Sequence, residues 1–368
     1  MRCRHGECAV TPIPWNKKPI TKPGLYTGIP MDAYHSPTIC GSEPSISSSM
    51  LRKLFLRSPA HYWAYSSYNP AGKPAEDEET EALILGRAGH HVLLGEKFFA
   101  ERYVIRPRKV LDQDLFWKPW NGNRTECIEW LKDHSHLTVL TPDQAEQIKG
   151  MALSLSCYPL VQEGALNGYV ECSMFWRDPR TGIWLKARPD VIPTDSGVYV
   201  DLKKTLSTDY IELQSAIDRY GLHMQAALIF EGAKQLKMPT EAFLLLFVEN
   251  DYPHTVRDVM LKDEDIALGA EVNIAMLDKF ARCWKSGNWP GPANDNIGGS
   301  IQLSERVRER IKRRLQFEKA DAGLSDETNV IPWRSKLSRH GGGFPRDAVA
   351  AIDSALITAG WTKESTRK

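Results

Sequence analysis

The clearest alternation of apolar segments and polar turns in this chain lies between residues 168 and 205. Segments 168–176, 183–192 and 198–205 are rich in β-branched and aromatic residues, and each is predicted to be a strand. The short sequences between them combine Asp with Pro and Gly, which favours tight turns. A fourth segment, 241–250, is apolar along most of its length and predicts a strand that is buried on both faces.

Apolar residues at helical spacing flank these strands. Helices are predicted over residues 78–95, 141–156, 208–237 and 263–287, with two short helices within 45–65. The first short helix is predicted to be capped by Ser48 or Ser49, and the second to begin at Ser58 with Pro59 as its first helical residue. Thr141 opens a Thr-Pro-Asp-Gln sequence that is typical of a capping box.

The order of these elements is helix, three strands, helix, strand and helix. Antiparallel strands joined by tight turns, followed by a helix and one more strand, predict an α/β fold with a central mixed β-sheet flanked by helices. A segment rich in Gly, Pro and Asn at 287–299 marks the predicted end of this domain. We divide the chain into an N-terminal arm (1–24), one domain (25–299) and a C-terminal helical appendage (300–368) with helices near 304–319 and 345–360.

Composition and charge indicate what kind of compartment and binding surface to expect. Of the 368 residues, 42% are hydrophobic and 25% charged, and the net charge of +1 means that a DNA-binding surface must be a local patch. The seven cysteines are odd in number and scattered, which favours reduced thiols in a cytoplasm over a disulfide framework. Cys3 and Cys8 have no second pair to complete a zinc site. We expect neither a secretory signal nor a membrane span, because no apolar run is long enough.

Charged residues that could carry chemistry stand on the predicted strands. Asp190 ends the second strand, and Asp201 and Lys203 lie two positions apart on the third, so these two share one face. Glu171 on the first strand could reach the same place. Clustered carboxylates can hold a metal that activates water for phosphodiester hydrolysis, and a nearby cation stabilises the transition state. A surface ion pair is the alternative, but Asp201 follows the apolar stretch 198–200, where a charge without a use would be costly.

Two further segments, 106–109 and 117–124, combine cations with aromatic residues. They lie in a stretch, 101–126, that shows no regular period and is predicted to be irregular. Because cations suit phosphates and exposed rings suit unpaired bases, this stretch is a candidate DNA contact that includes Arg124. The alternative is a loop whose tryptophans are buried against the body. The predicted helix at 304–319 is either a contact with DNA or a partner, or a solvated helix face.

Five stretches together resemble the RecE-like branch of the PD-(D/E)xK exonucleases, which is related to the nuclease domain of RecB. They are SISSSMLRKLFLRSPAHYWAY, ILGRAGHH with Gly86 and His90, YVECSMFW with Glu171, the pair ARPDVI and VYVDLKKT, and HMQAALIFEG with Gln225. They span about residues 24–290 in the order and spacing of that family. The resemblance implies a restriction-endonuclease-like core.

The resemblance also implies roles for the site residues. The implied catalytic residues are Asp190, Asp201, Lys203 and Glu171, and the implied metal ligands are His90, Asp190, Asp201 and the backbone carbonyl of Leu202. Lys203 would stabilise the pentacovalent phosphate or orient the attacking water. Magnesium is the implied ion, with manganese as its substitute, and an imidazole ligand fits manganese tolerance. Some relatives hold an iron–sulfur cluster through three late cysteines, but Cys283 stands alone after the core, so we expect no cluster.

Gln225 is similar to a glutamine that contacts the scissile strand in this family. With Arg124 and Lys204 it completes the predicted DNA contacts. A tyrosine commonly follows that glutamine by four residues, but Ile229 stands here, and Tyr220 is the aromatic residue that could take its place.

The implied activity is hydrolysis of DNA from duplex ends in the 5′-to-3′ direction, which leaves a 3′ overhang. The resemblance further implies a recombination role beside a single-strand annealing protein, often in a phage or prophage, and leaves a homo-oligomer open. One alternative is an endonuclease, or a flap or single-strand nuclease, that uses the same site. The other is a non-catalytic DNA-binding protein on a nuclease fold, against which the intact set of Asp190, Asp201 and Lys203 argues.

Overall fold

A computed structural model describes residues 10–73, 81–95, 99–170, 172–194, 196–291, 348–358 and 360, with three further residues between 305 and 309. Its helices are α1 (Met31–His35), α2 (Ser48–Leu56), α3 (Pro59–Ala64), α4 (Glu81–Leu93), α5 (Thr125–Asp133), α6 (Pro142–Cys157), α7 (Pro159–Gln162), α8 (Tyr210–Arg219), α9 (Leu222–Gln235), α10 (Asp263–Ser286) and α12 (Ala348–Thr358), with a 3-10 turn at Phe99–Glu101. Its strands are β1 (Ile13–Pro14), β2 (Gly24–Thr27), β3 (Ser45–Ser47), β4 (Tyr103–Ile105), β5 (Lys109–Leu111), β6 (Trp117–Pro119), β7 (Thr138–Leu140), β8 (Tyr169–Val170), β9 (Ser173–Arg177), β10 (Trp184–Ala187), β11 (Val191–Ile192), β12 (Val198–Thr205), β13 (Ala242–Glu249) and β14 (Val256–Met260).

The main strands form two mixed five-stranded sheets. The first has the order β1-β2-β9-β10-β3 and the second the order β14-β13-β12-β11-β8. The single strands predicted over 168–176 and 183–192 were wrong, because each segment contributes one strand to each sheet. In the second segment Pro189 lacks an amide N–H, and a strand cannot continue its ladder through such a residue. The predicted α/β class, with mixed sheets flanked by helices, is confirmed.

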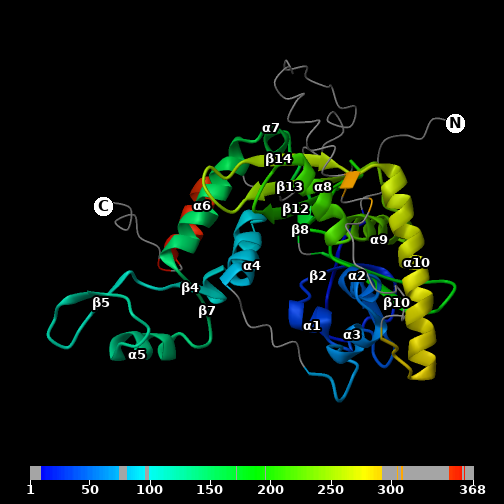
Figure 1. The fold of residues 1–368 in the computed structure, drawn as a ribbon, viewed down its shortest axis with the longest axis horizontal. Coiled ribbons are helices and arrows are strands. Elements are labelled where there is room, and N and C mark those ends of the chain that lie inside the picture. Colours follow the sequence, from blue (N-terminus) through cyan, green and yellow to red (C-terminus); the bar gives the residue numbers. More distant parts are fainter. Residues whose placement is uncertain are drawn as a thin grey trace.

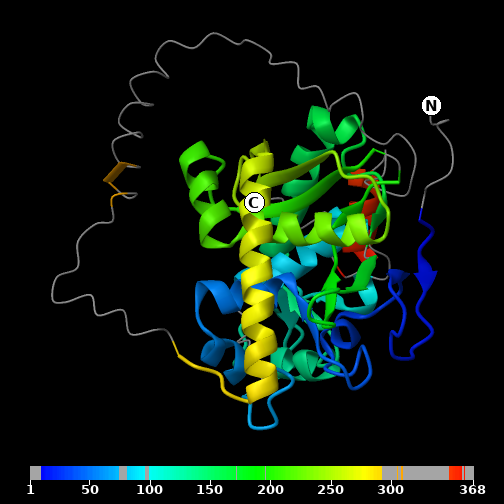
Figure 2. The same ribbon diagram turned by 90° about the vertical axis from the view of Figure 1, so that its right-hand side faces the viewer.

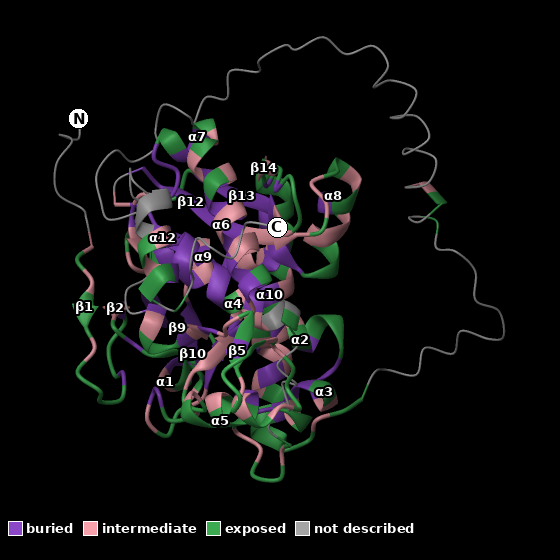
Figure 3. Ribbon diagram, turned by 90° about the vertical axis from the view of Figure 1, so that its left-hand side faces the viewer, coloured by how far each residue is buried: buried purple, intermediate pink, exposed green. Residues whose placement is uncertain are grey.

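Strands β12 and β13 form the centre of the second sheet. They pair in parallel along their full length, from Val198 opposite Ala242 to Thr205 opposite Glu249. Side chains alternate between two cores: one contains apolar residues of α4, α6 and α12, and the other those of α2, α9 and α10. Figure 1 shows helices on both sides of these strands, and Figure 3 shows the strands as largely buried.

Two predicted helix starts are confirmed. The side chain of Thr141 accepts a hydrogen bond from the backbone N–H of Gln144, and the Gln144 side chain accepts one from the Thr141 N–H, which completes a capping box at α6. Ser58 caps α3, and Pro59 is its first residue.

Two other helix predictions were wrong. The N-cap of α2 is Ser47 rather than Ser48 or Ser49, and its side chain makes no capping hydrogen bond. Residues 208–237 form α8 and α9 instead of one helix. Gly221 separates them with φ of +60°, a left-handed conformation that glycine adopts without strain and that ends a helix.

The stretch 101–126, predicted to be irregular, contains short regular elements. β4 pairs with β7 in parallel, and β5 pairs with β6 as a small antiparallel hairpin that precedes α5. Trp120 packs edge-on against Trp130 of α5, with 5.4 Å between ring centroids. Strands of three residues carry too little periodic pattern to be predicted. Figure 1 shows β5 and α5 projecting from the body.

The described ends of the chain pack against this body. β1 pairs with β2, and Ile352 and Leu356 of α12 are buried in the same core as α4 and α6. Cys3, Cys8 and most of the predicted helix at 304–319 lie outside the described residues. Within the described ranges, no helix combines the length and apolar character needed to cross a bilayer.

The close approach of α9 and α10 at Gly269 leads to a prediction about stability. A Cβ atom at Gly269 would lie 2.4 Å from the backbone carbonyl oxygen of His223, which cannot swing aside. Gly269→Ala should therefore lower the free energy of unfolding by about 1–3 kcal/mol. Gly122→Ala is the control, because no described atom lies within 4 Å of its Cβ position. Urea unfolding followed by circular dichroism measures both, and equal midpoints would contradict the close contact.

Candidate active site

The site forms where strand β12 loses its neighbour on one side. β11 pairs with β12 only at Val191 and Val200, so the backbone of Leu202 faces no strand on that side. Asp190, which follows Pro189 and precedes β11, fills the gap: its Oδ2 atom accepts a hydrogen bond of 2.7 Å from the Leu202 N–H. The chain's passage between the sheets thus places this carboxylate beside β12.

His90 of α4 completes the first group of polar atoms. Its Nε2 atom lies 3.1 Å from Asp190 Oδ2 and 3.2 Å from the Leu202 carbonyl oxygen. Both neighbours are acceptors, so Nε2 carries a proton in this arrangement. Gly86 lies one turn earlier on α4, where an added Cβ would stand 3.7 Å from Lys204 Nζ. The predicted Gly-x-x-x-His spacing therefore brings α4 close to β12 while aiming His90 at its open edge.

Asp201 and Lys203 form a second group on the opposite face of β12. Asp201 is only 1% exposed, and its Oδ2 atom lies 2.5 Å from Lys203 Nζ. Its Oδ1 atom accepts a hydrogen bond of 2.9 Å from Gln225 Nε2 on α9. The two carboxylate oxygens are therefore held by one cation and one amide, which fixes the carboxylate plane.

The charges of these groups act on one another. Burial lowers the pKa of His90, but the charge of Asp190 and the hydrogen bond to it outweigh burial and raise that pKa to about 8. Burial likewise opposes ionisation of Asp190, yet the imidazolium holds its pKa below the usual value. Burial, reinforced by Asp190, raises the pKa of Asp201 to about 6. Two carboxylates and two cations thus share a partly buried site, in which the side chains of His90 and Lys203 are 31% and 27% exposed.

The donor set fits a divalent metal. Neighbouring ligands of an octahedral ion at about 2.1 Å stand about 3.0 Å apart. The separations of His90 Nε2 from Asp190 Oδ2 and from the Leu202 carbonyl, 3.1 and 3.2 Å, are close to this value. Among the described residues, no three His, Cys, Asp or Glu side chains form a metal-binding group by themselves, so a metal here would need the backbone carbonyl. Magnesium accepts such oxygen ligands readily, and manganese accepts the imidazole as well.

A cavity of about 860 Å³ opens onto this site. Asp190, His90 and Gln225 line it together with residues of α1, α2 and the 3-10 turn region. Its charged lining among the described residues consists of Arg52, Arg87, Arg102, Arg188, Asp32 and Asp190, besides the histidines. This excess of guanidinium groups in a protein of nearly neutral charge suits a polyanion.

The structure places the other predicted residues at different distances from the cavity. Gln225 lines the cavity. The side chain of Lys204 lies beside Gly86 and Gly89 of α4, on the face of β12 opposite to Asp201 and Lys203. Burial lowers the pKa of Lys204 to about 8. Arg124 begins α5 in the projecting region and is not part of the cavity lining. Glu171 lies outside the described residues. The DNA contacts of Arg124 and Lys204 stay predictions.

The expected aromatic partner of Gln225 can now be located. Ile229 is buried and lines the cavity one turn after Gln225. Tyr220 is more than half exposed on the other side of Gly221, and its backbone carbonyl accepts a hydrogen bond of 2.8 Å from Arg52 Nη1. An apolar side chain therefore occupies the position where the family commonly has a tyrosine.

Arg52 is a site residue that sequence reasoning missed. Its guanidinium lines the cavity, its Nε atom is buried without a hydrogen-bond partner, and the charge of Asp201 partly offsets the lowering of its pKa by burial. Ser48, one turn earlier on α2, also has a buried hydroxyl without a partner. The Ser-rich start of α2 followed by an arginine at helical spacing was the available signal, but it indicated only a helix and the family resemblance.

The raised pKa of His90 predicts how metal affinity depends on pH. A ligating imidazole must be neutral, so below about pH 8 a metal must displace the proton that Asp190 stabilises. Manganese affinity, measured by electron paramagnetic resonance, should rise about fivefold from pH 7 to 8 and by up to about twofold more before it levels off near pH 9. His90→Ala should bind more weakly and lose this rise, whereas His134→Ala on the projecting α5 region should keep it. A wild-type affinity that stays constant across this range would contradict the assignment.

One protein family accounts for most of this chain. A family model described as a PDDEXK-like domain of unknown function matches residues 47–297. No curated protein matches the chain. A crystal structure of a provisionally named exonuclease from Eubacterium rectale is 12% identical, with a TM-score of 0.45 over 72% of this chain and 92% of that one, a likeness that carries no conclusion about activity. Because the family model covers more than half of the chain, this protein belongs to the family of PD-(D/E)xK-like domains.

Proposed function

We propose that this protein is a metal-dependent exodeoxyribonuclease that hydrolyses phosphodiester bonds from the ends of duplex DNA. The observation that carries the proposal is the convergence of His90, Asp190 and the Leu202 carbonyl beside the buried Asp201–Lys203 pair. These residues match the PD-(D/E)xK pattern in type and spacing, and His90 and Asp190 line the arginine-rich cavity. A structural ion pair alone would not account for a separate histidine at the open edge of the same strand.

The residues divide the work of phosphodiester hydrolysis. His90, Asp190, Asp201 and the Leu202 carbonyl would hold magnesium, or manganese in its place, and the bound ion would supply an activated water and neutralise phosphate charge. Lys203 stays protonated, because Asp201 and Asp190 outweigh the effect of burial and raise its pKa. Its ammonium group can therefore donate to a phosphate oxygen as negative charge builds up there. Gln225 donates a hydrogen bond to the other oxygen of Asp201 and so fixes the orientation of the carboxylate beside Lys203.

The finer parts of the proposal rest on the RecE-like resemblance. They are 5′-to-3′ polarity, a 3′ overhang as product, a role in recombination beside a single-strand annealing protein, and work in a bacterial cytoplasm. The four arginines in the lining of the cavity favour a polyanionic substrate such as DNA. Glu171 would lie at the edge of the metal site, and a homo-oligomer remains compatible with these roles.

Removing either member of the buried pair tests the chemistry. Asp201→Asn and Lys203→Gln should each lower the rate of duplex digestion by about 1000-fold or more. The first removes a carboxylate that would hold the metal, and the second removes the ammonium group that would donate to the phosphate. Lys285→Gln, at an exposed position near the end of α10, is the control and should digest at the wild-type rate. The rate is measured with end-labelled duplex and magnesium. Unchanged magnesium-dependent digestion by Asp201→Asn would rule the assignment out.

End dependence and polarity need a separate experiment. Linear duplex labelled at either the 5′ or the 3′ end is digested beside a closed circle of the same sequence. We expect the circle to resist and the 5′ label to be released first. Cleavage of the circle would favour the endonuclease alternative, and early release of the 3′ label would reverse the polarity.

A further inference from the structure

A second cavity, of about 520 Å³, lies away from the arginine-lined one and shares no residue with it. Helix α9 contributes to both: Gln225 and Ile229 face the catalytic cavity, whereas Ala227, Leu228 and Phe230 line the second one. The two sites are thus separated by the thickness of one helix. An occupant of the second cavity would leave the catalytic cavity open.

The second cavity is an elongated groove between α9 and α10. On α10 its lining residues are Asp263, Ile266, Ala267, Ala270, Asn273, Ile274 and Leu277, a stripe at helical spacing that extends over four turns. At 1.5 Å per residue this stripe is about 21 Å long. Figure 2 shows α10, in yellow, running along most of the height of the molecule. A groove of this length fits a helix of about 14 residues better than a compact small molecule.

The floor of the groove is aliphatic. Leu51, Leu185 and Leu228 lie at its base, and Ile274 on its rim is half exposed. Few polar groups converge on this floor, so it offers little to a polar metabolite. It suits apolar side chains at i, i+3, i+4 and i+7 of an amphipathic helix.

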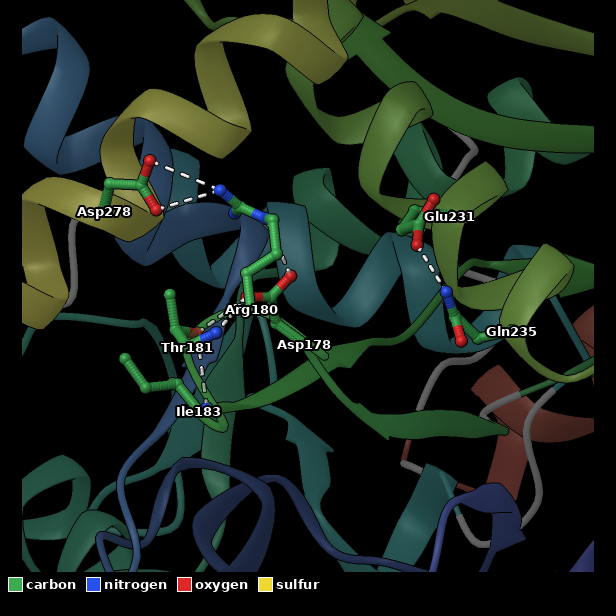
Figure 4. Close-up of polar contacts among 7 residues, drawn as sticks. All are labelled: Asp178, Arg180, Thr181, Ile183, Glu231, Gln235 and Asp278. Atoms are coloured by element: carbon green, nitrogen blue, oxygen red, sulfur yellow. Dashed lines mark hydrogen bonds and ion pairs between the residues drawn. The ribbon is translucent and has the colours of Figure 1, made fainter.

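The rim of the groove is acidic. Arg180 lies between two carboxylates, 3.5 Å from Asp178 Oδ1 and 3.0 Å from Asp278 Oδ1, so this end keeps an excess of negative charge. Figure 4 shows Arg180 reaching from the β9–β10 turn to Asp278 on α10, with Glu231 and Gln235 on the neighbouring α9. Glu231 lines the groove and accepts a hydrogen bond of 2.8 Å from Gln235. Asp263 adds a carboxylate at the other end, and Lys234 is the second cation of the rim among the described residues.

We propose that this groove docks a basic amphipathic helix of a partner protein, with apolar anchors on the floor and Lys or Arg side chains on the acidic rim. The acidic rim would repel nucleic acid, so the groove and the arginine-lined cavity select opposite charges. The protein can then hold a partner and keep its catalytic cavity accessible. This inference stands on the groove alone and does not depend on the proposed nuclease activity.

The test uses a fluorescein-labelled 16-residue helical peptide with leucines at i, i+3, i+4 and i+7 and lysines elsewhere, and a second peptide with glutamates in place of the lysines. Fluorescence anisotropy with the full chain should show saturable binding of the lysine peptide and at least tenfold weaker binding of the glutamate peptide.

Two pairs of variants locate the binding. Ala267→Trp fills the groove from an exposed position and should weaken binding of the lysine peptide at least tenfold, whereas Ala275→Trp, exposed on α10 outside the groove, should not. Glu231→Lys should weaken the lysine peptide and strengthen the glutamate peptide, whereas Glu271→Lys, exposed outside the groove, should leave both unchanged. Circular dichroism checks the folding of each variant. If a tryptophan variant does not fold, the result of the Glu231→Lys and Glu271→Lys pair decides the test.

Other occupants give different results, and each of them overturns the proposal. Equal binding by Ala267→Trp and Ala275→Trp would place the peptide elsewhere. Tight binding of the neutral dye Nile red without binding of the peptide would indicate a small apolar ligand. A concentration-dependent dimer in light scattering that Ala267→Trp abolishes would make a second copy of this chain the occupant.

Discussion

On its β11 side, strand β12 is paired only as far as Val200, and the backbone of Leu202 must find partners elsewhere. A buried peptide group without a hydrogen bond costs about 1–3 kcal/mol, so such a gap persists only where side chains fill it. Asp190 takes the N–H, and His90 approaches the carbonyl. The same gap that would weaken an ordinary sheet thus gathers a carboxylate, an imidazole and a carbonyl at one point. The second sheet, the break at Pro189 and the placement of α4 all serve to bring these three groups together.

Much of this site could be predicted from the sequence because its signals are local. Asp201 and Lys203 share a face by strand alternation alone, and β12 has the predicted bounds. Gly86 and His90 lie on one face of α4 by helical spacing. Gln225 was predicted as a DNA contact, which stays a prediction, and the structure shows its side chain hydrogen-bonded to Asp201. The pairs Asp201–Lys203 and Gly86–His90 each owe their relation to a period that is visible in a single segment, whereas Gln225 was identified by the family resemblance.

The parts that could not be predicted depend on contacts between distant segments. The division of 168–176 and 183–192 between two sheets is decided by pairing with β2, β3 and β12, which no local pattern encodes. The break at Gly221 was hidden because the apolar period continues on both sides of it. Arg52 reaches the site across the interface between α2 and α9, and its importance appears only when Tyr220 and Asp201 are in place. The sequence shows which residue types are present, but it does not show which distant strands pair or which side chains become buried together.

The interleaving of β2, β3, β9 and β10 in the first sheet has a consequence for dividing the chain. β9 and β10 lie between β2 on one side and β3 on the other, although β2 and β3 come more than a hundred residues earlier. A fragment cut at the start of the family match, residue 47, would lose β1, β2 and nearly all of β3. Both edges of the β9–β10 pair would then present unpaired backbone groups to other molecules, which favours aggregation. The smallest fragment that keeps this sheet closed on both sides therefore begins before Gly24, well outside the segment that defines the family.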